Sequence, residues 1–364
     1  MFNNIYKNKK VLITGHTGFK GSWLSAWLIK LGANVVGYSV DIPTKPSHFK
    51  ELNIDSKIKH YIGDVCDFSN LFNVCKTEKP EFIFHLAAQP LVIKSFEDPL
   101  TTFNTNVIGT LNIAEIVRKL SNVIKVCIFI TSDKAYRNVE WEFGYREDDI
   151  LGGEDPYSGS KGAAELVIYS YMESFFKNTN YPNIASVRAG NVIGGGDWAE
   201  NRIIPDIVKS WVSNKTVKIR NPLSTRPWQH VLEPLSGYLL LGSNLYSNNL
   251  IHNTSFNFGP DSTVNKNVGE LIEKFIKYWP HKSLWENISK NKSNHESNLL
   301  KLCCDRANIL LNWFPTLSFD ETIRFTASWY EDFYFNEKET FNITMDQIDE
   351  YCKIAESNNL CWVK

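Results

Sequence analysis

Two short polar groups near the middle of the chain could carry out proton transfer. Ser132, Asp133 and Lys134 place a hydroxyl, a carboxylate and an amine side by side after an apolar run. Further along, Tyr157 and Lys161 are four positions apart, and residues at that spacing share one face of a helix. An ammonium beside a phenol stabilises the phenolate and lowers the tyrosine pKa, so that the tyrosine exchanges a proton near neutral pH. An ordinary exposed helical pair has the same spacing, so this interpretation needs support from the rest of the chain.

A glycine-rich turn near the N-terminus gives that support. An apolar run over 11–14 ends at Gly15-His-Thr-Gly-Phe-Lys-Gly21, an amphipathic stretch follows over 22–31, and a second apolar run over 35–38 ends near Asp41. A strand, a glycine-rich turn, a helix and a second strand within about thirty residues are typical of the dinucleotide-binding βαβ unit. The glycines let backbone N–H groups approach a pyrophosphate at the helix N-terminus. A turn with no ligand is the alternative.

The acidic residues after these strands indicate which dinucleotide binds. Asp41 follows Gly21 by twenty residues, where a carboxylate accepts hydrogen bonds from both ribose hydroxyls and repels a 2′-phosphate, so NAD is favoured over NADP. Asp64, after a later apolar run, is placed to reach an adenine amino group. The predicted NAD contacts are Gly15, Thr17, Gly18, Phe19, Lys20, Gly21, Asp41, Asp64, Val65, Leu86, Ala87, Ala88, Tyr157 and Lys161.

Further apolar runs over 60–62, 82–86, 126–130 and 184–187 fit strands that helices bury on both faces. Ligands gather at the carboxyl ends of such strands, which is where Ser132, Asp133 and Lys134 fall. The predicted fold is α/β, a Rossmann-like doubly wound parallel sheet with a smaller, interleaved α/β C-terminal cap. We expect an NAD-binding domain over 1–188, with a returning strand near 229–260, and a cap with a helical C-terminal tail over 189–364.

The composition excludes several classes of protein. Hydrophobic residues make up 43% and charged residues 22%, and the net charge of −1 indicates neither a nucleic-acid nor an acidic-membrane surface. The seven cysteines include no C-x-x-C, so they form neither a disulfide framework nor a zinc pattern and fit buried thiols in a reducing compartment. No long apolar span or signal core is present. We expect a cytoplasmic protein.

The motifs together resemble a known family. G-x-x-G-x-x-G, H-L-A-A, N-x-x-G-T and Y-x-x-x-K are similar to the extended short-chain dehydrogenase/reductases. Within that family, residues 15–23, 131–134, 144–147 and 226–230 resemble the CDP-glucose 4,6-dehydratases, and the resemblance runs from about residue 9 to residue 330. It implies a homodimeric lyase of deoxysugar biosynthesis, as for lipopolysaccharide O-antigen.

The resemblance also implies a reaction and a role for each polar residue. Hydride leaves C4 of CDP-glucose for NAD while Tyr157 accepts the C4 hydroxyl proton, water is lost across C5 and C6, and the hydride returns to C6. Lys161 tunes Tyr157 and binds the nicotinamide ribose, and Ser132 supports the proton transfer. Asp133 is the acid at C6 and needs a raised pKa, whereas Lys134 is the base at C5 and needs a lowered one. A salt-bridged Asp133–Lys134 pair without these roles is the alternative.

Substrate contacts are expected from the second half of the chain. Asn191 is expected at the phosphates, Arg202 and Arg226 clamp the diphosphate, Trp198 stacks on the base or simply packs, and Gln89 completes the predicted set. The rival interpretations are a 4,6-dehydratase for a dTDP-, GDP- or UDP-linked sugar, an NAD-dependent nucleotide-sugar 4-epimerase, and a non-catalytic NAD-binding scaffold. An epimerase needs no acid and base at C5 and C6, so Asp133 and Lys134 argue against it.

Overall fold

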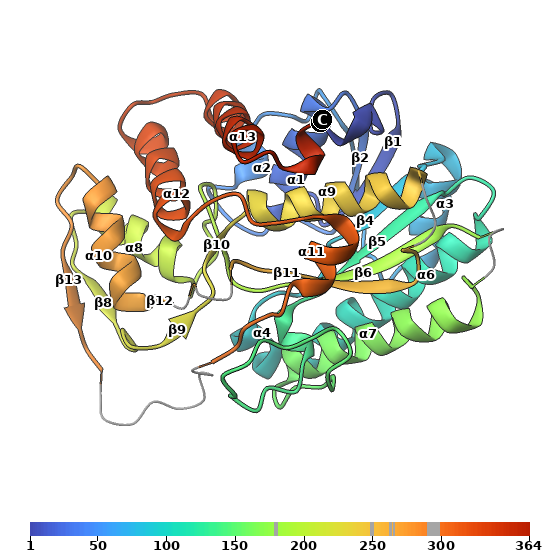
Figure 1. Ribbon diagram of the computed structural model, residues 1–364. Coiled ribbons are helices and arrows are strands. Elements are labelled where there is room, and N and C mark those ends of the chain that lie inside the picture. The colour runs from blue at the N-terminus through green and yellow to red at the C-terminus, as the bar shows by residue number, and fades with distance from the viewer. Residues whose placement is uncertain (178–180, 248–250, 262–263, 265, 290–298) are drawn as a thin grey trace.

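A seven-stranded parallel sheet forms the centre of the computed structural model, which describes residues 1–177, 181–247, 251–261, 264, 266–289 and 299–364 (Figure 1). Its strand order is β11-β6-β5-β4-β1-β2-β3, and every neighbouring pair is parallel. The strands are β1 (Lys10–Thr14), β2 (Asn34–Ser39), β3 (Lys59–Ile62), β4 (Phe82–His85), β5 (Val126–Ile130), β6 (Asn183–Ala189) and β11 (Thr254–Phe258). This order confirms the predicted doubly wound sheet.

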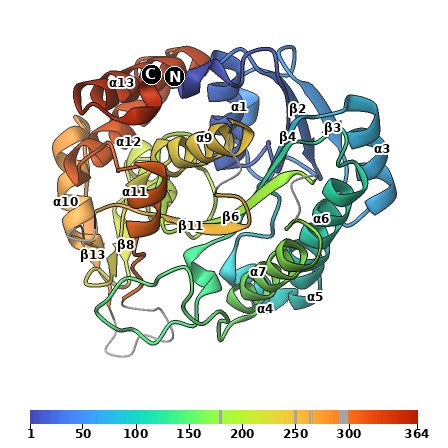
Figure 2. The same ribbon diagram turned by 45° about the vertical axis from the view of Figure 1, so that its right-hand side comes forward.

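Side chains alternate between two cores on the two faces of the sheet. From β1, Val11 and Ile13 enter one core and Leu12 enters the other. The first face is covered by α1 (Phe19–Lys30) and α9 (Leu232–Ser247), and the second by α3 (Phe68–Glu78), α6 (Gly109–Lys119) and α7 (Pro156–Ser174), as Figures 1 and 2 show. Because both faces are buried, the inner strands read as continuous apolar runs in the sequence.

A smaller cap lies beside the carboxyl ends of the strands (Figure 1). It contains β7 (Val192–Ile193), α8 (Ile203–Val212), β8 (Val217–Ile219), β9 (Thr225–Arg226), β10 (Gln229–His230), β12 (Lys266–Asn267), α10 (Val268–Tyr278), β13 (Trp285–Asn287) and α12 (Phe319–Tyr334). Its strands pair as β10–β7, β12–β9 and β13–β8. Between β10 and β12 the chain returns to the large sheet through α9 and β11, so the cap is interleaved, as predicted.

The C-terminal tail packs back onto the N-terminal half. Helix α13 (Thr340–Ser357) lies against α1 and α12, and Thr344 Oγ1 is 3.0 Å from Nε2 of His48, which lies in α2 (His48–Glu51). The Asn3 N–H donates to the carbonyl of Lys364 at 3.2 Å, so the two termini are adjacent (Figure 2). The remaining short helices are η1 (Phe2–Asn4), α4 (Val92–Glu97), α5 (Pro99–Phe103), η2 (Asn104–Ile108), η3 (Asp133–Ala135), α11 (Asp305–Leu311) and η4 (Cys361–Val363).

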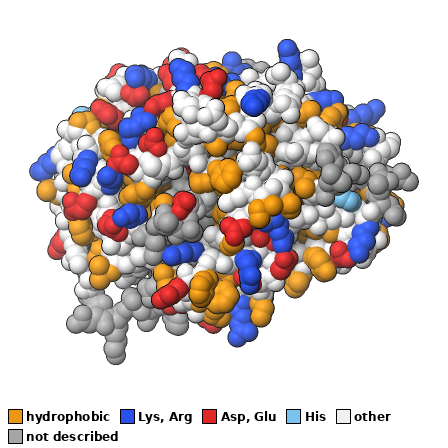
Figure 3. Space-filling model, viewed as in Figure 1, with side chains coloured by type: hydrophobic (Ala, Val, Ile, Leu, Met, Phe, Trp, Pro, Cys, Tyr) orange, Lys and Arg blue, Asp and Glu red, His pale blue; other side chains and the backbone are white. Residues whose placement is uncertain are grey.

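The surface shows no concentration of one charge. Figure 3 shows Lys, Arg, Asp and Glu side chains intermixed with hydrophobic ones over the face seen there, which fits the net charge of −1. Among the residues that the structure describes, no helix is long and apolar enough to cross a membrane.

Candidate active site

The backbone of the glycine-rich turn between β1 and α1 is open to contact with a ligand. Gly15 has φ +77° and lies so close to Ala87 that a Cβ at this position would be 2.8 Å from the Ala87 nitrogen. A Cβ on Gly21 would be 2.2 Å from the Gly15 carbonyl oxygen. Gly18, the N-cap of α1, carries no side chain over the helix N-terminus. The turn is therefore a cradle that only glycines can form, and it fits the pyrophosphate of a dinucleotide at a helix N-terminus.

Replacing Gly15 by alanine tests this cradle. Gly15→Ala should lower the free energy of unfolding by about 1–3 kcal/mol, because it adds a left-handed backbone strain to a close contact with Ala87. It should also weaken NAD binding. Gly152→Ala is the matched control, since Gly152 has φ +119° but a Cβ there meets nothing within 4 Å. Urea unfolding would measure the stability of the two variants, and calorimetric titration would measure their affinity for NAD. Equal stability and equal NAD affinity in the two variants would contradict the role assigned to Gly15.

The other predicted cofactor residues line the same strand ends. Thr17 Oγ1 donates to the carbonyl of Asp41 at 2.6 Å, which brings the exposed Asp41 beside the glycine turn. Asp64 is also exposed, and its Oδ1 accepts from the Cys66 N–H at 2.8 Å. Leu86, Ala87 and Ala88 follow β4 directly, and Leu86 and Ala87 N–H groups donate to Thr14. Phe19 and Lys20 are half-buried in the first turn of α1, and Val65 is buried against Gly109.

Tyr157 and Lys161 lie in the first two turns of α7, and the sequence contains clear signals for the start of this helix. The Asp155 side chain accepts from the Ser158 N–H at 2.9 Å, and Pro156 occupies the first turn. Both functional side chains are buried, at 8% and 6% exposure, so they are not the exposed pair that the spacing alone would allow. Burial lowers the pKa of Lys161 to about 8, and the nearby Glu165 carboxylate opposes this shift.

The Tyr157 pKa differs from the prediction. Burial raises it to about 12, and a hydrogen bond with Ser132 is the largest opposing effect. The prediction of a lowered pKa considered only the lysine ammonium and neglected the cost of placing a phenolate in a dry site. The contact with Ser132 nevertheless joins the two polar groups that are 25 positions apart in the sequence (157 − 132).

Ser132, Asp133 and Lys134 follow β5 and form the beginning of η3. The Ser132 hydroxyl accepts from the Lys134 N–H at 3.2 Å and donates to Asp133 Oδ1 at 2.9 Å. Asp133 is 4% exposed, and burial raises its pKa even though Lys134 and Ser132 act in the opposite direction. This is the direction that a carboxylic acid needs if it is to give up a proton during a reaction.

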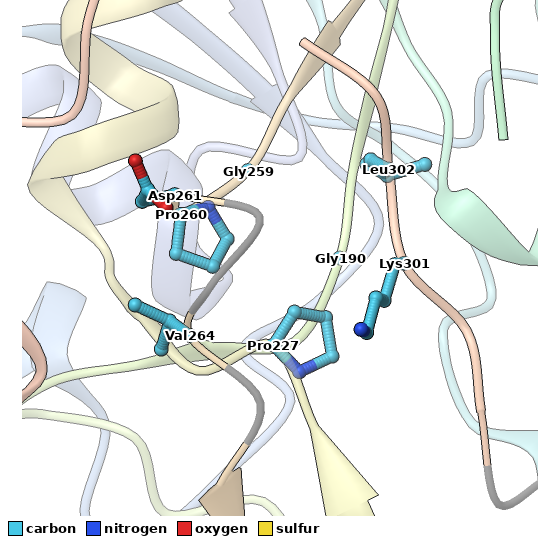
Figure 4. A pocket seen from close by; sticks show the side chains of 8 residues that line it. All are labelled: Gly190, Pro227, Gly259, Pro260, Asp261, Val264, Lys301 and Leu302. Atoms are coloured by element: carbon cyan, nitrogen blue, oxygen red, sulfur yellow. The ribbon is translucent and has the colours of Figure 1, made fainter. Parts of the chain in front are cut away.

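A pocket is lined in part by Gly190, which lies beside the carboxyl group of Asp133. A Cβ on Gly190 would be 3.2 Å from Asp133 Oδ2 and 3.6 Å from Pro227, so the missing side chain leaves space beside the carboxyl group. The pocket is lined by Gly190, Pro227, Gly259, Pro260, Asp261, Val264, Lys301 and Leu302. In Figure 4 the Lys301 side chain points toward Pro227 across it. Asn191 and Arg226, both half-buried, adjoin two of these lining residues in the chain.

Further charges surround the same carboxyl group. Burial and the positive charge of Arg202 lower the pKa of Lys20 to about 8, while the Asp133 carboxyl opposes this shift. Arg202 Nη1 donates to Asp197 Oδ2 at 2.9 Å, and Tyr330 holds Asp197 in turn through its backbone. Arg202 is thus placed toward Tyr157, on whose pKa it also acts, and it is not an isolated surface charge.

Two predicted substrate residues have other partners. Trp198 is 2% exposed, its Nε1–H donates to Tyr334 Oη at 2.9 Å, and its ring packs on Trp329 and Phe333. Of the two alternatives for Trp198, these contacts favour packing over stacking on the base. Gln89 Nε2 donates to Leu91 O and Thr102 Oγ1, and its Oε1 accepts from the Leu91 N–H. These contacts use both amide hydrogens, so they favour a loop-fixing role over the predicted substrate contact.

Sequence reasoning missed Gly190 and a buried ion pair between Glu165 and Arg188. The signal for the pair was present, because Arg188 interrupts an apolar strand and Glu165 lies one helical turn beyond Lys161. A charge in such a run needs a partner when it is buried. The partner itself could not be identified before the fold placed α7 against β6.

Comparisons with known proteins agree with this geometry. The family model for GDP-mannose 4,6 dehydratase matches residues 12–326. CDP-glucose 4,6-dehydratase of Salmonella typhimurium is 48% identical over 90% of this chain and 92% of its own length. UDP-glucose 4-epimerase of Mycoplasma pneumoniae is only 25% identical, over 89% of this chain and 97% of its own.

Solved structures share the fold. The structure of dTDP-glucose 4,6-dehydratase from Bacillus anthracis in complex with NAD has a TM-score of 0.75 at 20% identity, and the match covers 90% of this chain and 99% of that one. The chain therefore belongs to the family of nucleotide-sugar 4,6-dehydratases, an enzyme family of hydro-lyases.

Proposed function

We propose that this protein is an NAD-dependent 4,6-dehydratase that converts CDP-D-glucose to CDP-4-dehydro-6-deoxy-D-glucose. The observation that carries the proposal is the buried carboxyl of Asp133, hydrogen-bonded to Ser132 at the start of η3, which packs against α7, the helix of Tyr157. A dehydratase needs an acid near the tyrosine that accepts the C4 hydroxyl proton, because water must leave from C6, and an epimerase does not. The relative from Salmonella typhimurium named CDP-glucose 4,6-dehydratase supports the choice of CDP-glucose.

The residues of the site supply the proton transfers. Bound NAD would be held by the turn over 15–21 and by Asp41, and it would take up a hydride from C4 and give it back at C6. Tyr157 accepts the proton of the C4 hydroxyl, Ser132 holds the C4 oxygen, and Lys161 binds the nicotinamide ribose. The C4 ketone acidifies C5, so Lys134 can remove the C5 proton. Asp133 gives its proton to the C6 hydroxyl, which leaves as water. When the hydride returns to C6, C5 takes up a proton again, which the protonated Lys134 can supply after exchange with solvent.

The two halves of the chain divide the binding. We infer that residues 1–188 bind NAD and that 189–364 mainly bind the nucleotide sugar. Asn191, Arg202 and Arg226 would contact its diphosphate, since guanidinium groups bind phosphate oxygens through two hydrogen bonds. The pocket beside Gly190 would admit part of the substrate next to Asp133.

A substrate panel tests the proposed activity. The purified protein should convert CDP-glucose, and should act poorly on dTDP-, GDP- and UDP-glucose. The 4-keto product is detected by its absorbance in alkali. Reaction of another nucleotide sugar in preference to CDP-glucose would overturn the base assignment. A change of configuration at C4 without water loss would indicate the epimerase, and no reaction with any of the sugars would indicate the scaffold.

The assembly and setting of the enzyme are also proposals. Leu166 and Tyr169 on α7 are 59% and 61% exposed, and Leu100 on the adjacent α5 is 72% exposed, which favours a homodimer that buries this face (Figure 2). A monomer in sedimentation equilibrium would contradict it.

We place the enzyme in the cytoplasm, in the synthesis of deoxysugars such as those of lipopolysaccharide O-antigen, and fractionation of cells would test the location.

A further inference from the structure

A buried ion pair lies behind the site and takes no part in the proton transfers above. Arg188 Nη2 donates to Glu165 Oε2 at 2.8 Å, and the two side chains are 3% and 2% exposed. Such pairs contribute little net stability, because the cost of removing both charges from water offsets their attraction. The contacts of this pair with the catalytic segments indicate another role.

The Glu165 carboxylate ties α7 to the start of the Ser132–Lys134 segment. Glu165 is four positions beyond Lys161 and eight beyond Tyr157, so the three share a face of α7. It accepts a short hydrogen bond from the hydroxyl of Thr131, the residue that precedes Ser132. A second hydroxyl, that of Ser186 on β6, donates to it at 2.9 Å.

The Arg188 guanidinium holds the other end of the same segment. Its Nη1 donates to Tyr136 Oη at 2.7 Å and to the Glu147 carbonyl at 2.8 Å, and its Cζ atom lies 4.8 Å from the centre of the Tyr136 ring. Tyr136 directly follows η3, and its hydroxyl donates to Asn257 Oδ1 on β11 at 2.8 Å. The ion pair thus hydrogen-bonds to Thr131 and to Tyr136, which flank Ser132, Asp133 and Lys134 in the chain.

We propose that Glu165 and Arg188 are positioning residues that hold the Ser132–Asp133–Lys134 segment in register with Tyr157 and Lys161. This inference rests on the proposed dehydratase function. The first half-reaction uses groups mainly on α7, whereas water loss uses Asp133 and Lys134 on the segment that this ion pair holds. Weakening the hydrogen bonds of this ion pair should therefore slow water loss more than C4 oxidation. It should also change kcat more than KM, because, in the described part of the chain, neither Glu165 nor Arg188 contacts a residue predicted to bind the substrate.

Two conservative variants test this positioning role, each with a matched control. Tyr136→Phe removes one hydroxyl from the Arg188 end, and Glu165→Gln removes the charge from the other. The controls are Tyr61→Phe and Glu78→Gln, because the Tyr61 hydroxyl donates to the Glu78 carboxylate at 2.6 Å and Glu78, 3% exposed, pairs with Lys10 and Lys59 where β1 and β3 begin. Each control makes the same chemical change in an ion-paired cluster at the opposite ends of the strands.

The measurements are kcat, KM for CDP-glucose, and the NADH bound to the enzyme during turnover. We expect kcat to fall roughly 10²-fold for Glu165→Gln, and by a smaller factor for Tyr136→Phe, with KM nearly unchanged and bound NADH increased. Unchanged kcat and bound NADH in folded Tyr136→Phe, or an equal effect in the two controls, would overturn the positioning role. Failure of the wild-type enzyme to dehydrate CDP-glucose would instead overturn the proposed function.

Discussion

Asp133→Asn should oxidise the sugar at C4 and then stop before water is lost. The carboxyl group is buried with a raised pKa and lies beside the space left by Gly190, so it is the group placed to protonate a departing C6 hydroxyl. Asparagine keeps the shape and the contact with Ser132 but cannot supply the proton. Turnover should fall about 10²- to 10⁴-fold, the usual effect of a general acid. Single-turnover mixing with CDP-glucose should show NADH that forms and persists.

The neighbouring base gives the same result by a different route. Lys134→Ala should also accumulate NADH, because the ketone forms but the C5 proton stays in place. Asp55→Asn is the control, since this carboxylate pairs with Lys50 on the surface and should leave turnover unchanged. Normal turnover in Asp133→Asn or in Lys134→Ala would refute the role assigned to that residue.

Tyr157→Phe should block the reaction one step earlier. The phenol is the group that Ser132 contacts in the buried site, and without it the C4 hydroxyl has no proton acceptor. We expect turnover to fall about 10²- to 10⁴-fold, and no NADH to form on mixing with CDP-glucose. The distinction from Asp133→Asn is therefore qualitative, because one variant accumulates NADH and the other does not.

A second tyrosine of the same helix serves as the control. Tyr169 is 61% exposed on the face of α7 that we propose for the dimer, and phenylalanine keeps its ring there, so Tyr169→Phe should form NADH and product at the normal rate. NADH formation by Tyr157→Phe at the rate of this control would show that another group accepts the C4 proton. The assignment of Tyr157 as the acceptor of the C4 hydroxyl proton would then be wrong, although the proposed dehydratase activity would stand.

The sheet, and the positions in it of the residues that we propose to be catalytic, could be predicted because local sequence patterns determine them. Continuous apolar runs identified β4, β5 and β6 as buried strands, and the glycine spacing identified the turn before α1. A strand end places Ser132 and Asp133 at the carboxyl edge of the sheet by geometry alone. The Tyr157–Lys161 spacing required only that α7 be helical, which Asp155 and Pro156 signal directly.

The residues that could not be predicted depend on distant segments. Trp198 is in the core because α12 supplies Trp329, Phe333 and Tyr334, more than a hundred residues later. The Tyr157 pKa depends on burial, which a two-residue pattern does not contain. The partner of Arg188 became identifiable only when β6 and α7 lay together.

The fate of the C4 hydrogen tests the central claim most directly. CDP-glucose that carries deuterium at C4 would be converted by the enzyme in ordinary water, and the product would be analysed by NMR and mass spectrometry. We predict that the deuterium appears in the C6 methyl group, while C5 carries a hydrogen from the solvent. Deuterium that returned to C4, or that was lost to water, would contradict a mechanism in which one bound NAD carries the hydride from C4 to C6.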